Sequence, residues 1–394
     1  MSRPADSLLE ILAVDVPAAD RRLRGFYLGV PKPGDAPDPR ELLLRGWILA
    51  EDEPVLGIEV AHDGNVVGRV AVELPRPDIF ARYEDLPHAA TCGFEHRLNL
   101  LAVAGGLELG IRGVLSPVQR VPIATLSIRA PVGEGELVSV VIPCFKQAHF
   151  LGEAIESVLA QTHPRLEILV VDDGSPDNVG EVAARYPGVR CLRRENDGLA
   201  AARNVGLERA AGDFVLFLDA DDRLLSEAIA VGLSELRAAP KAMMAAGTWR
   251  LIGEVGEPIP ADLPEQPQEA YPALLESCFI STPAAVLYRR ALFEEIGDFD
   301  PTVSASADYD LYLRTAARFP VRLHDHVIAE YRRHGANMTR DPELILHSEL
   351  AVLERQRPLV EARPELKETL ERGLARSRAY HGERIEQMRE EDAR

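Results

Sequence analysis

The stretch Asp213-Phe-Val-Leu-Phe-Leu-Asp-Ala-Asp-Asp222 joins an apolar strand directly to a cluster of carboxylates. Five apolar residues in a row, 214–218, are typical of a strand that is buried on both faces of a parallel sheet. The three carboxylates that follow, Asp219, Asp221 and Asp222, repel one another unless a cation lies among them. Mg²⁺ and Mn²⁺ prefer such oxygen ligands and bridge to substrate phosphates. The stretch therefore predicts a strand that ends in a metal site, with a solvated acidic loop as the alternative.

The chain around this strand alternates apolar runs with helical patterns. Continuous apolar or β-type runs occupy 138–142, 166–171 and 189–192, and residues 151–159 carry apolar side chains at helical spacing. Strands that alternate with helices predict βαβ crossovers and a Rossmann-like, mostly parallel sheet. Such sheets bind ligands beyond the carboxyl ends of their strands. We expect this α/β domain to span residues 137–341.

The flanking regions differ from this domain in composition and in residue pattern. Residues 1–130 hold short β-type runs separated by turn signals, including His62-Asp-Gly-Asn65, and predict a β-sandwich-like accessory domain. Residues 131–136 read as a Pro- and Gly-containing linker. Residues 342–394 are rich in Glu, Arg, Leu and Ala, and predict a helical C-terminal extension divided by prolines. We expect packing or assembly roles for both flanking regions, with glycan or acceptor binding by the first as the alternative.

The composition excludes several classes of protein. The 394 residues include 63 acidic and 44 basic side chains, a formal net charge of -19, so bulk charge does not favour a nucleic-acid partner. No apolar run approaches the ~20 residues that a transmembrane helix needs, and residues 1–6 are followed by no signal-type apolar core. The four cysteines lie far apart, which favours a reduced, cytoplasmic setting without disulfides or a zinc site.

Further candidate residues lie at a second strand end and in the loop between the two acidic ends. Asp172 and Asp173 follow the run 166–171. Buried carboxylates need donor partners, such as a base N–H or ribose hydroxyls; an Asp-Gly turn is the alternative. Gly198 opens a small-residue helix that carries Arg203. Helix amides and arginine favour a nearby anion, although Arg203 could instead pair with a neighbouring carboxylate.

Two single residues complete the set of candidates. Asp308 begins a helical pattern in which an acidic residue is also ordinary capping. His334 ends Tyr331-Arg-Arg-His334, which follows an apolar run. A lone histidine is more often structural, but a metal site predicted nearby favours a role as ligand.

Taken in order, these stretches resemble the motifs of the family-two inverting glycosyltransferases of the GT-A fold. The stretches are Val138-Ser-Val-Val-Ile-Pro-Cys-Phe-Lys, Val171-Asp-Asp-Gly-Ser, Asn196-Asp-Gly-Leu-Ala-Ala-Ala-Arg-Asn, Phe217-Leu-Asp-Ala-Asp-Asp, Ala307-Asp-Tyr-Asp-Leu and Tyr331-Arg-Arg-His. They span about half of the chain. The amino-terminal region is similar to the β-rich module that precedes such domains in some bacterial polysaccharide and lipopolysaccharide glycosyltransferases.

The resemblance implies a role for each candidate residue. Pro143 and Phe145 would line the pocket for the nucleotide sugar. Asp173 would accept from N3–H of uracil or thymine, and Asp172 would support the loop. Gly198 and Arg203 would lie near the base and diphosphate. Asp219 and Asp221 would form the DxD pair that touches ribose and metal, His334 would contact metal or diphosphate, and Asp308 would be the catalytic base. The chain departs from the family at Phe145-Lys146, where Tyr-Asn is common, and at Ala307, where Glu is common.

The resemblance also implies a reaction, the inverting transfer of a sugar that depends on Mn²⁺ or Mg²⁺. The donor would be a nucleoside-diphosphate sugar, with UDP as the favoured nucleotide. The acceptor would be a hydroxyl of a glycan or lipid-linked saccharide. The enzyme must neutralise charge on the leaving diphosphate and remove a proton from the hydroxyl. A lipid-linked acceptor would bring this cytoplasmic protein into peripheral contact with the inner face of the membrane, and the helical extension could form a homo-oligomer.

Two other functions remain as alternatives. A sugar nucleotidyltransferase usually has a Gly-rich basic loop after its first strand, whereas residues 143–151 contain no glycine. A non-catalytic glycan-binding or scaffold module would not need the carboxylates Asp219, Asp221 and Asp308, all of which are present.

Overall fold

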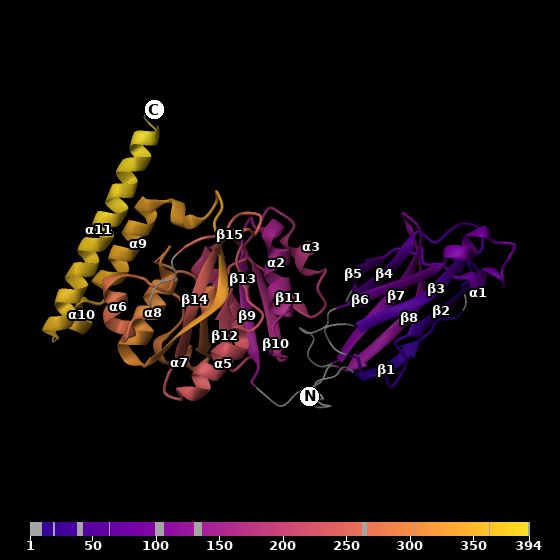
Figure 1. Ribbon diagram of the computed structural model, residues 1–394, viewed down its shortest axis with the longest axis horizontal. Coiled ribbons are helices and arrows are strands. Elements are labelled where there is room, and N and C mark those ends of the chain that lie inside the picture. Colours follow the sequence, from indigo (N-terminus) through magenta and orange to yellow (C-terminus); the bar gives the residue numbers. More distant parts are fainter. Residues whose placement is uncertain are drawn as a thin grey trace. The chain divides into compact units, whose positions relative to one another are not determined.

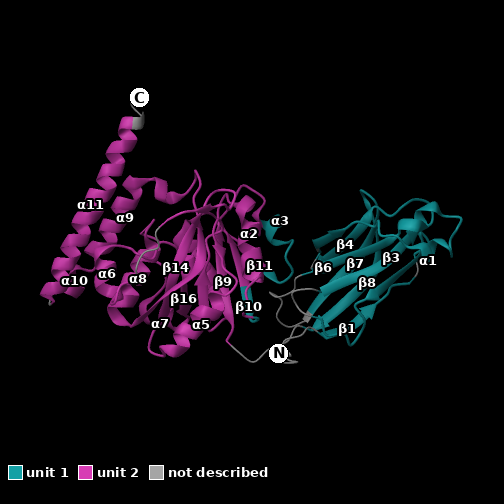
Figure 2. Ribbon diagram, in the orientation of Figure 1, with its two compact units in different colours: residues 1–135, 164–167, 180–189 teal, residues 136–163, 168–179, 190–394 magenta. Residues whose placement is uncertain are grey.

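The computed structural model, shown in Figure 1, describes residues 10–18, 20–37, 42–62, 64–98, 106–129, 136–261, 266–303, 305–361 and 363–392. The chain divides into two compact units, coloured separately in Figure 2. The first comprises residues 1–135 with the short segments 164–167 and 180–189, and the second comprises the remaining residues.

The first unit contains two antiparallel sheets. One has the order β1 (Glu10–Asp15), β8 (Gln119–Arg129), β7 (Gly106–Ser116), β4 (Gly57–His62), β5 (Asn65–Val70), and the other the order β2 (Leu23–Val30), β3 (Leu42–Ala50), β6 (Gly93–Leu98). Leu44, Ile58 and Leu109 belong to one buried cluster, so the two sheets pack face to face around a common core. This arrangement confirms the predicted β-rich module.

Local predictions for this unit can be checked where the chain is described. The predicted hairpin is confirmed, because His62 pairs with Asn65 across the turn; Asp63 lies outside the described residues. Linker residues 131–135 also lie outside them. The short helices α1 (Pro77–Phe80) and η2 (Pro87–Thr91) were not predicted.

A nine-stranded mixed sheet belongs to the second unit, except for residues 166, 167 and 189 of its strands, which fall in the first. Its order is β11 (Val189–Arg193), β10 (Leu166–Asp172), β9 (Val138–Cys144), β12 (Phe214–Phe217), β16 (Val286–Arg289), β14 (Met244–Ile252), β17 (Val321–Arg332), β13 (Arg223–Leu224), with β15 (Pro258–Ile259) paired to β14. β12 runs parallel to β9, and β16 lies antiparallel between β12 and β14. All seven residues of β9 are buried, as expected for an apolar central strand.

Helices connect and cover these strands (Figure 1). They are α2 (Ala148–Leu159), α3 (Val179–Ala183), α4 (Leu199–Arg209), α5 (Ala228–Ala238), α6 (Ala270–Glu276), α7 (Ala291–Ile296) and α8 (Ala307–Arg318), with 3-10 turns η3 (Pro283–Ala285) and η4 (Met338–Arg340). The chain order β9–α2–β10–α3–β11–α4–β12 is the predicted alternation of strands and helices. α2 buries Leu151, Ile155 and Val158, because the 3.6-residue period places them on one face.

The C-terminal helices share the core of this unit. They are α9 (Pro342–Glu354), α10 (Arg357–Val360) and α11 (Pro364–Asp392). Val352, Leu370 and Leu374 belong to the same buried cluster as the sheet residue Val215. A Cβ atom at Gly373 would lie 2.0 Å from the carbonyl oxygen of Leu275, so this glycine lets α11 approach α6 closely. None of the described helices has the length and apolar character of a membrane span.

Candidate active site

A cleft of about 420 Å³ lies where β9, β10 and β12 end. The carboxyl ends of neighbouring strands meet at one edge of a sheet, so the cleft gathers residues that are distant in sequence. Its lining includes these predicted site residues: Pro143, Phe145, Asp173, Gly198, Arg203, Asp219, Asp221 and Asp308. Asp172 and His334 are outside the lining, and each supports a residue or loop that borders the cleft.

Asp173 anchors the loop that leads into α4. Its carboxylate accepts hydrogen bonds from the backbone N–H of Asp197 (3.2 Å) and of Gly198 (2.9 Å), and the Arg194 guanidinium lies 3.3 Å away. Gly198 has φ +91°, a conformation that favours glycine, at the N-cap of α4. Each carboxylate oxygen can accept a second bond, so Asp173 retains capacity for a donor in the cleft.

Asp172 has a supporting position. Its oxygens accept from the backbone N–H of Ser175 (2.8 Å) and from Arg193 Nη1 (2.7 Å), and its side chain is 1% exposed. These contacts fix the turn after β10. The other wall of the cleft carries Phe145, which is 39% exposed, next to Lys146, whose φ is +58°. The ammonium of Lys146 lies 4.9 Å from the Phe145 ring centre.

Arg203 is a buried cation that lines the cleft. Its Nη2 donates to Asp219 Oδ1 at 2.7 Å, and its guanidinium lies 5.3 Å from the Phe299 ring centre. Arg203 therefore pairs with a neighbouring carboxylate, the alternative to anion binding that the sequence left open. However, Arg203 Nε is buried and has no hydrogen-bond partner among the described residues. Because a buried donor without a partner is costly, the cleft is suited to an anion at this position.

Asp221 receives two donors on a single oxygen. Gln147 Nε2 and His334 Nε2 each lie 2.8 Å from Asp221 Oδ2. His334 Nδ1 accepts from the Ala336 N–H at 3.2 Å, so the proton of the neutral ring is on Nε2 and points to Asp221. Burial, and then the charge of Asp219, raise the pKa of Asp221, while His334 opposes the shift.

Asp308 borders the cleft from the first turn of α8. Its Oδ1 accepts from the N–H of Tyr309 at 2.8 Å, and the N-cap Ser306 makes no side-chain cap. Burial raises the pKa of Asp308, and the positive charge of Arg203 opposes that increase. A partly buried carboxylate with a raised pKa that faces a cleft is suited to accept a proton.

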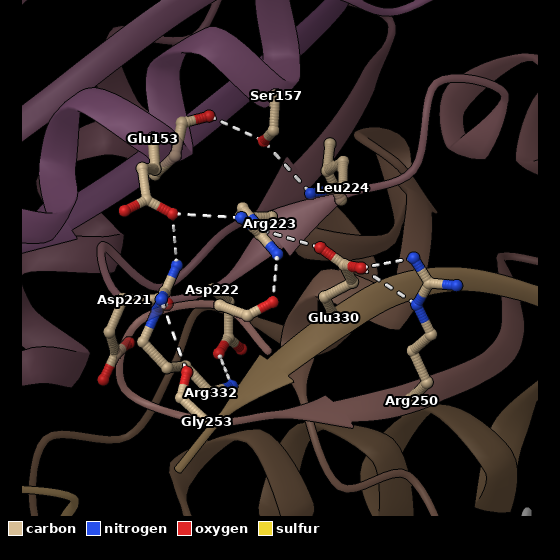
Figure 3. A network of polar contacts seen from close by, with 12 residues as sticks. Glu153, Ser157, Asp221, Asp222, Arg223, Leu224, Arg250, Gly253, Glu330 and Arg332 are labelled. Carbon is tan, nitrogen blue, oxygen red and sulfur yellow. Dashed lines mark hydrogen bonds and ion pairs between the residues drawn. The ribbon is translucent and has the colours of Figure 1, made fainter. Parts of the chain in front are cut away.

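A polar network around Asp221 and Asp222 holds the acidic turn, as shown in Figure 3. The Arg332 side chain is fully buried. It donates to the carbonyl oxygens of Asp221 (2.7 Å) and Glu254 (2.8 Å) and to Glu153 Oε2 (2.6 Å). The backbone N–H of Arg332 donates to Asp222 Oδ1 at 2.9 Å. This one residue therefore ties β17 to α2 and to the acidic turn.

Asp222 is the most deeply buried member of the acidic cluster. It is 1% exposed, and Thr282 Oγ1 donates to its Oδ2 at 2.7 Å. Burial and the charges of Asp221 and Asp219 raise the pKa of Asp222 well above its ordinary value. Asp222 is thus part of the scaffold, while Asp219 and Asp221 face the cleft.

The donor set of the cleft fits a divalent cation. The hydrogen bonds described above use Oδ1 of Asp219 and Oδ2 of Asp221, which leaves the other oxygen of each carboxylate for a metal ion. Among the described residues, no three His, Cys, Asp or Glu side chains form a ready metal-binding group. Mg²⁺ is commonly held by one or two carboxylates together with substrate phosphates and water, and this pair matches that pattern. For His334 to become a further ligand, its ring proton would have to move from Nε2 to Nδ1, which accepts from the Ala336 N–H in this structure.

Sequence reasoning missed several residues of the site. Gln147, Asn196 and Tyr331 line the cleft, as does the loop 336–339. Arg332 and Thr282 were not singled out. Their partners in the acidic turn lie 60 to 111 residues away in the chain, and no local pattern signals such contacts.

The fold and the cleft define the class of the second unit, an α/β domain of GT-A type. Comparison with known proteins agrees with this class. Residues 139–297 match the family model of Glycosyl transferase family 2. This match covers 159 of the 394 residues.

Relatives match about half of the chain. An uncharacterized glycosyltransferase of Rickettsia felis is 30% identical over 210 residues, which are 52% of this chain and 34% of that protein. EpsJ of Bacillus subtilis, also an uncharacterized glycosyltransferase, is 30% identical over 222 residues, 52% of this chain and 64% of EpsJ. The chain thus spans about one third to two thirds of the length of these relatives. The solved structure of S. aureus TarS 1-349 with UDP-GlcNAc is 21% identical, with a TM-score of 0.49 over 62% of this chain and 74% of that one.

Proposed function

We propose that this protein is an inverting glycosyltransferase that moves a sugar from a nucleoside-diphosphate sugar to a hydroxyl group. The observation that carries the proposal is the meeting of Asp173, Arg203, Asp219, Asp221 and Asp308 on one cleft. These groups match the needs of the reaction, which are recognition of a base, neutralisation of a diphosphate and removal of a proton.

The residues would divide the work as follows. Asp173, held by two backbone amides, would accept from N3–H of uracil or thymine, and UDP is the nucleotide that the family resemblance favours. Arg203, with Nε free of protein partners among the described residues, would stabilise the leaving diphosphate together with the N-terminal amides of α4. Asp219 and Asp221 would hold Mn²⁺ or Mg²⁺, which when bound supplies positive charge to the diphosphate.

Asp308 would act as the general base in a single displacement. Its raised pKa increases its affinity for a proton relative to a solvent-exposed aspartate. A hydroxyl that is deprotonated as it attacks the anomeric carbon, opposite to the diphosphate, inverts that carbon. The acceptor would be a saccharide, free or lipid-linked, of the kind used in polysaccharide synthesis. A lipid-linked acceptor would place the protein at the cytoplasmic face of a membrane.

A donor screen tests this function. Purified full-length protein is incubated with UDP-, GDP- and dTDP-sugars, with and without Mn²⁺, and release of the free nucleoside diphosphate is measured. We expect release from a UDP-sugar that depends on the cation. Absence of turnover and of binding with every donor would favour a non-catalytic glycan-binding module instead, and release of pyrophosphate from a nucleoside triphosphate and a sugar phosphate would favour a nucleotidyltransferase.

A further inference from the structure

A second hollow, of about 570 Å³, lies beside the donor cleft in the same unit. One wall is the loop that follows β17, and the other is the C-terminal part of α11. We call it the arginine groove, and its lining residues are Arg333, His334, Gly335, Asn337, Thr339, Arg340, Arg384, Gln387 and Met388.

The groove is positively charged in a strongly acidic protein. Its described lining contains three guanidinium groups and no carboxylate, whereas the chain has a formal net charge of -19. Arg333, Arg340 and Arg384 make no ion pair with any described carboxylate. By contrast, Arg389, five residues further along α11, pairs with Glu343 at 2.8 Å. An arginine in this part of α11 can therefore find a carboxylate partner, whereas the three that line the groove have none among the described residues.

One of the three arginines is held in place. Arg384 Nη2 donates to the carbonyl oxygen of Thr339 at 3.1 Å, and its guanidinium lies 5.7 Å from the Tyr380 ring centre. This bond ties α11 to the loop and keeps the charge at the groove wall. A guanidinium group in a fixed position is well suited to phosphate, because it presents several N–H donors in a planar fork.

The groove adjoins the donor cleft. Asn337 and Thr339 line both hollows. His334 lines the groove and also donates to Asp221, one of the two proposed metal ligands. A ligand in the groove therefore lies next to the place where the diphosphate of the donor is expected, and a molecule that extends from the groove can enter the cleft that contains Asp308.

We infer that the arginine groove binds an anionic portion of the acceptor, a saccharide that carries phosphate groups. The inference rests on the proposed glycosyl transfer and names the substrate class for its second substrate. The reacting hydroxyl would lie in the cleft, and a phosphate one or a few units away would lie between Arg333, Arg340 and Arg384. Neutral oligosaccharides would lack this anchor.

Binding to matched probes tests the inference on the full-length protein. The probes are phosphopentamannose and unphosphorylated mannopentaose, titrated at low ionic strength, because salt weakens contacts between exposed charges. The test variant is Arg333→Glu/Arg340→Glu, which leaves the Arg384 bond intact. The control variant is Lys241→Glu/Arg290→Glu, which makes the same charge change at two exposed residues that line neither hollow. UDP with Mn²⁺ is titrated separately into every variant.

We expect the wild type and the control to bind phosphopentamannose about tenfold more tightly than mannopentaose, and the test variant to lose this preference. UDP affinity should be the same in the wild type and the control, and in the test variant it should change much less than the preference between the two mannose probes, because Arg333 and Arg340 do not line the donor cleft. A preference that survives in the test variant, or equal binding of the two probes by the wild type, would overturn the inference.

Lipid vesicles test the other possible source of phosphate, the head groups of an anionic membrane. Sedimentation with phosphatidylglycerol vesicles, with phosphatidylcholine vesicles as the reference, measures attraction to an anionic surface. Binding to phosphatidylglycerol alone, without binding to phosphopentamannose, would assign the groove to a membrane surface and overturn its role in acceptor binding. Failure of UDP binding in the wild type would instead count against the proposed glycosyl transfer, and is a separate result from the comparison of the two mannose probes.

Discussion

Replacement of Arg332 by methionine should destabilise the second unit and loosen the acidic turn. Methionine has a similar length but no donors, so the carbonyl oxygens of Asp221 and Glu254 would lose their partners. A buried acceptor left without a donor costs about 1–3 kcal/mol. Glu153 loses less, because its side chain is 43% exposed and keeps Arg223 as a partner at 3.1 Å.

Part of this cost is offset, since the variant no longer buries a charged group. We therefore expect the free energy of unfolding to fall by about 2–3 kcal/mol. The matched control is Arg250→Met in the same network. Arg250 has a side chain that is 50% exposed and pairs with Glu330, which also keeps Arg223, so its loss should cost about 0–1 kcal/mol.

Urea denaturation of both variants, followed by far-ultraviolet circular dichroism, measures the difference. Most of the described helices lie in the second unit, so the signal reports mainly on that unit. Hydrogen exchange at the amides of residues 219–224 supplies a local measurement and should be faster in Arg332→Met only. Equal stability of the two variants, with unchanged exchange in this segment, would refute the assignment of Arg332 as the residue that holds the turn.

Three further predictions concern the acidic cluster and Asp308. Asp221→Ala should weaken Mn²⁺-dependent binding of UDP, measured by calorimetry, and an unchanged dependence on Mn²⁺ would argue against Asp221 as a ligand. Because burial raises the pKa of Asp308 and a base must be ionised to act, kcat/KM should rise with pH through an apparent pKa above the ordinary 3.8; an acid limb at or below that value would contradict the assignment. Thr282→Val removes the donor to the buried carboxylate of Asp222, so the free energy of unfolding should fall by about 1–3 kcal/mol, whereas Thr282→Ser should retain wild-type stability.

The strands and the cleft could be predicted because their signals are local. Apolar runs such as 138–142 and 214–218 are typical of strands that are buried on both faces, and β9 and β12 lie at these positions. Acidic residues directly after such runs must lie at the carboxyl edge of the sheet, which is why Asp173 and Asp219 meet at one cleft.

Contacts between distant segments could not be predicted from the sequence. The bond between Arg332 and Asp221 joins residues 111 positions apart, and nothing in Tyr331-Arg-Arg-His334 indicates which arginine turns inward. Glycine usually weakens a helix, and the sequence does not reveal that Gly373 permits the close approach of α11 to α6. The division of the acidic cluster, with Asp222 buried and Asp219 and Asp221 in the cleft, likewise depends on the position of Thr282, which a different segment supplies.

The most direct test of the account is the comparison of Asp308→Asn with Asp310→Asn in donor binding and in sugar transfer. Asp310 lies on the same helix and is 2% exposed, but it pairs with Arg314 and does not line the cleft. Asp308→Asn should bind the donor with unchanged affinity and lose transfer by a factor of about 10²–10⁴, while folded Asp310→Asn should keep transfer. A normal transfer rate in Asp308→Asn would contradict the assignment of Asp308 as the catalytic base.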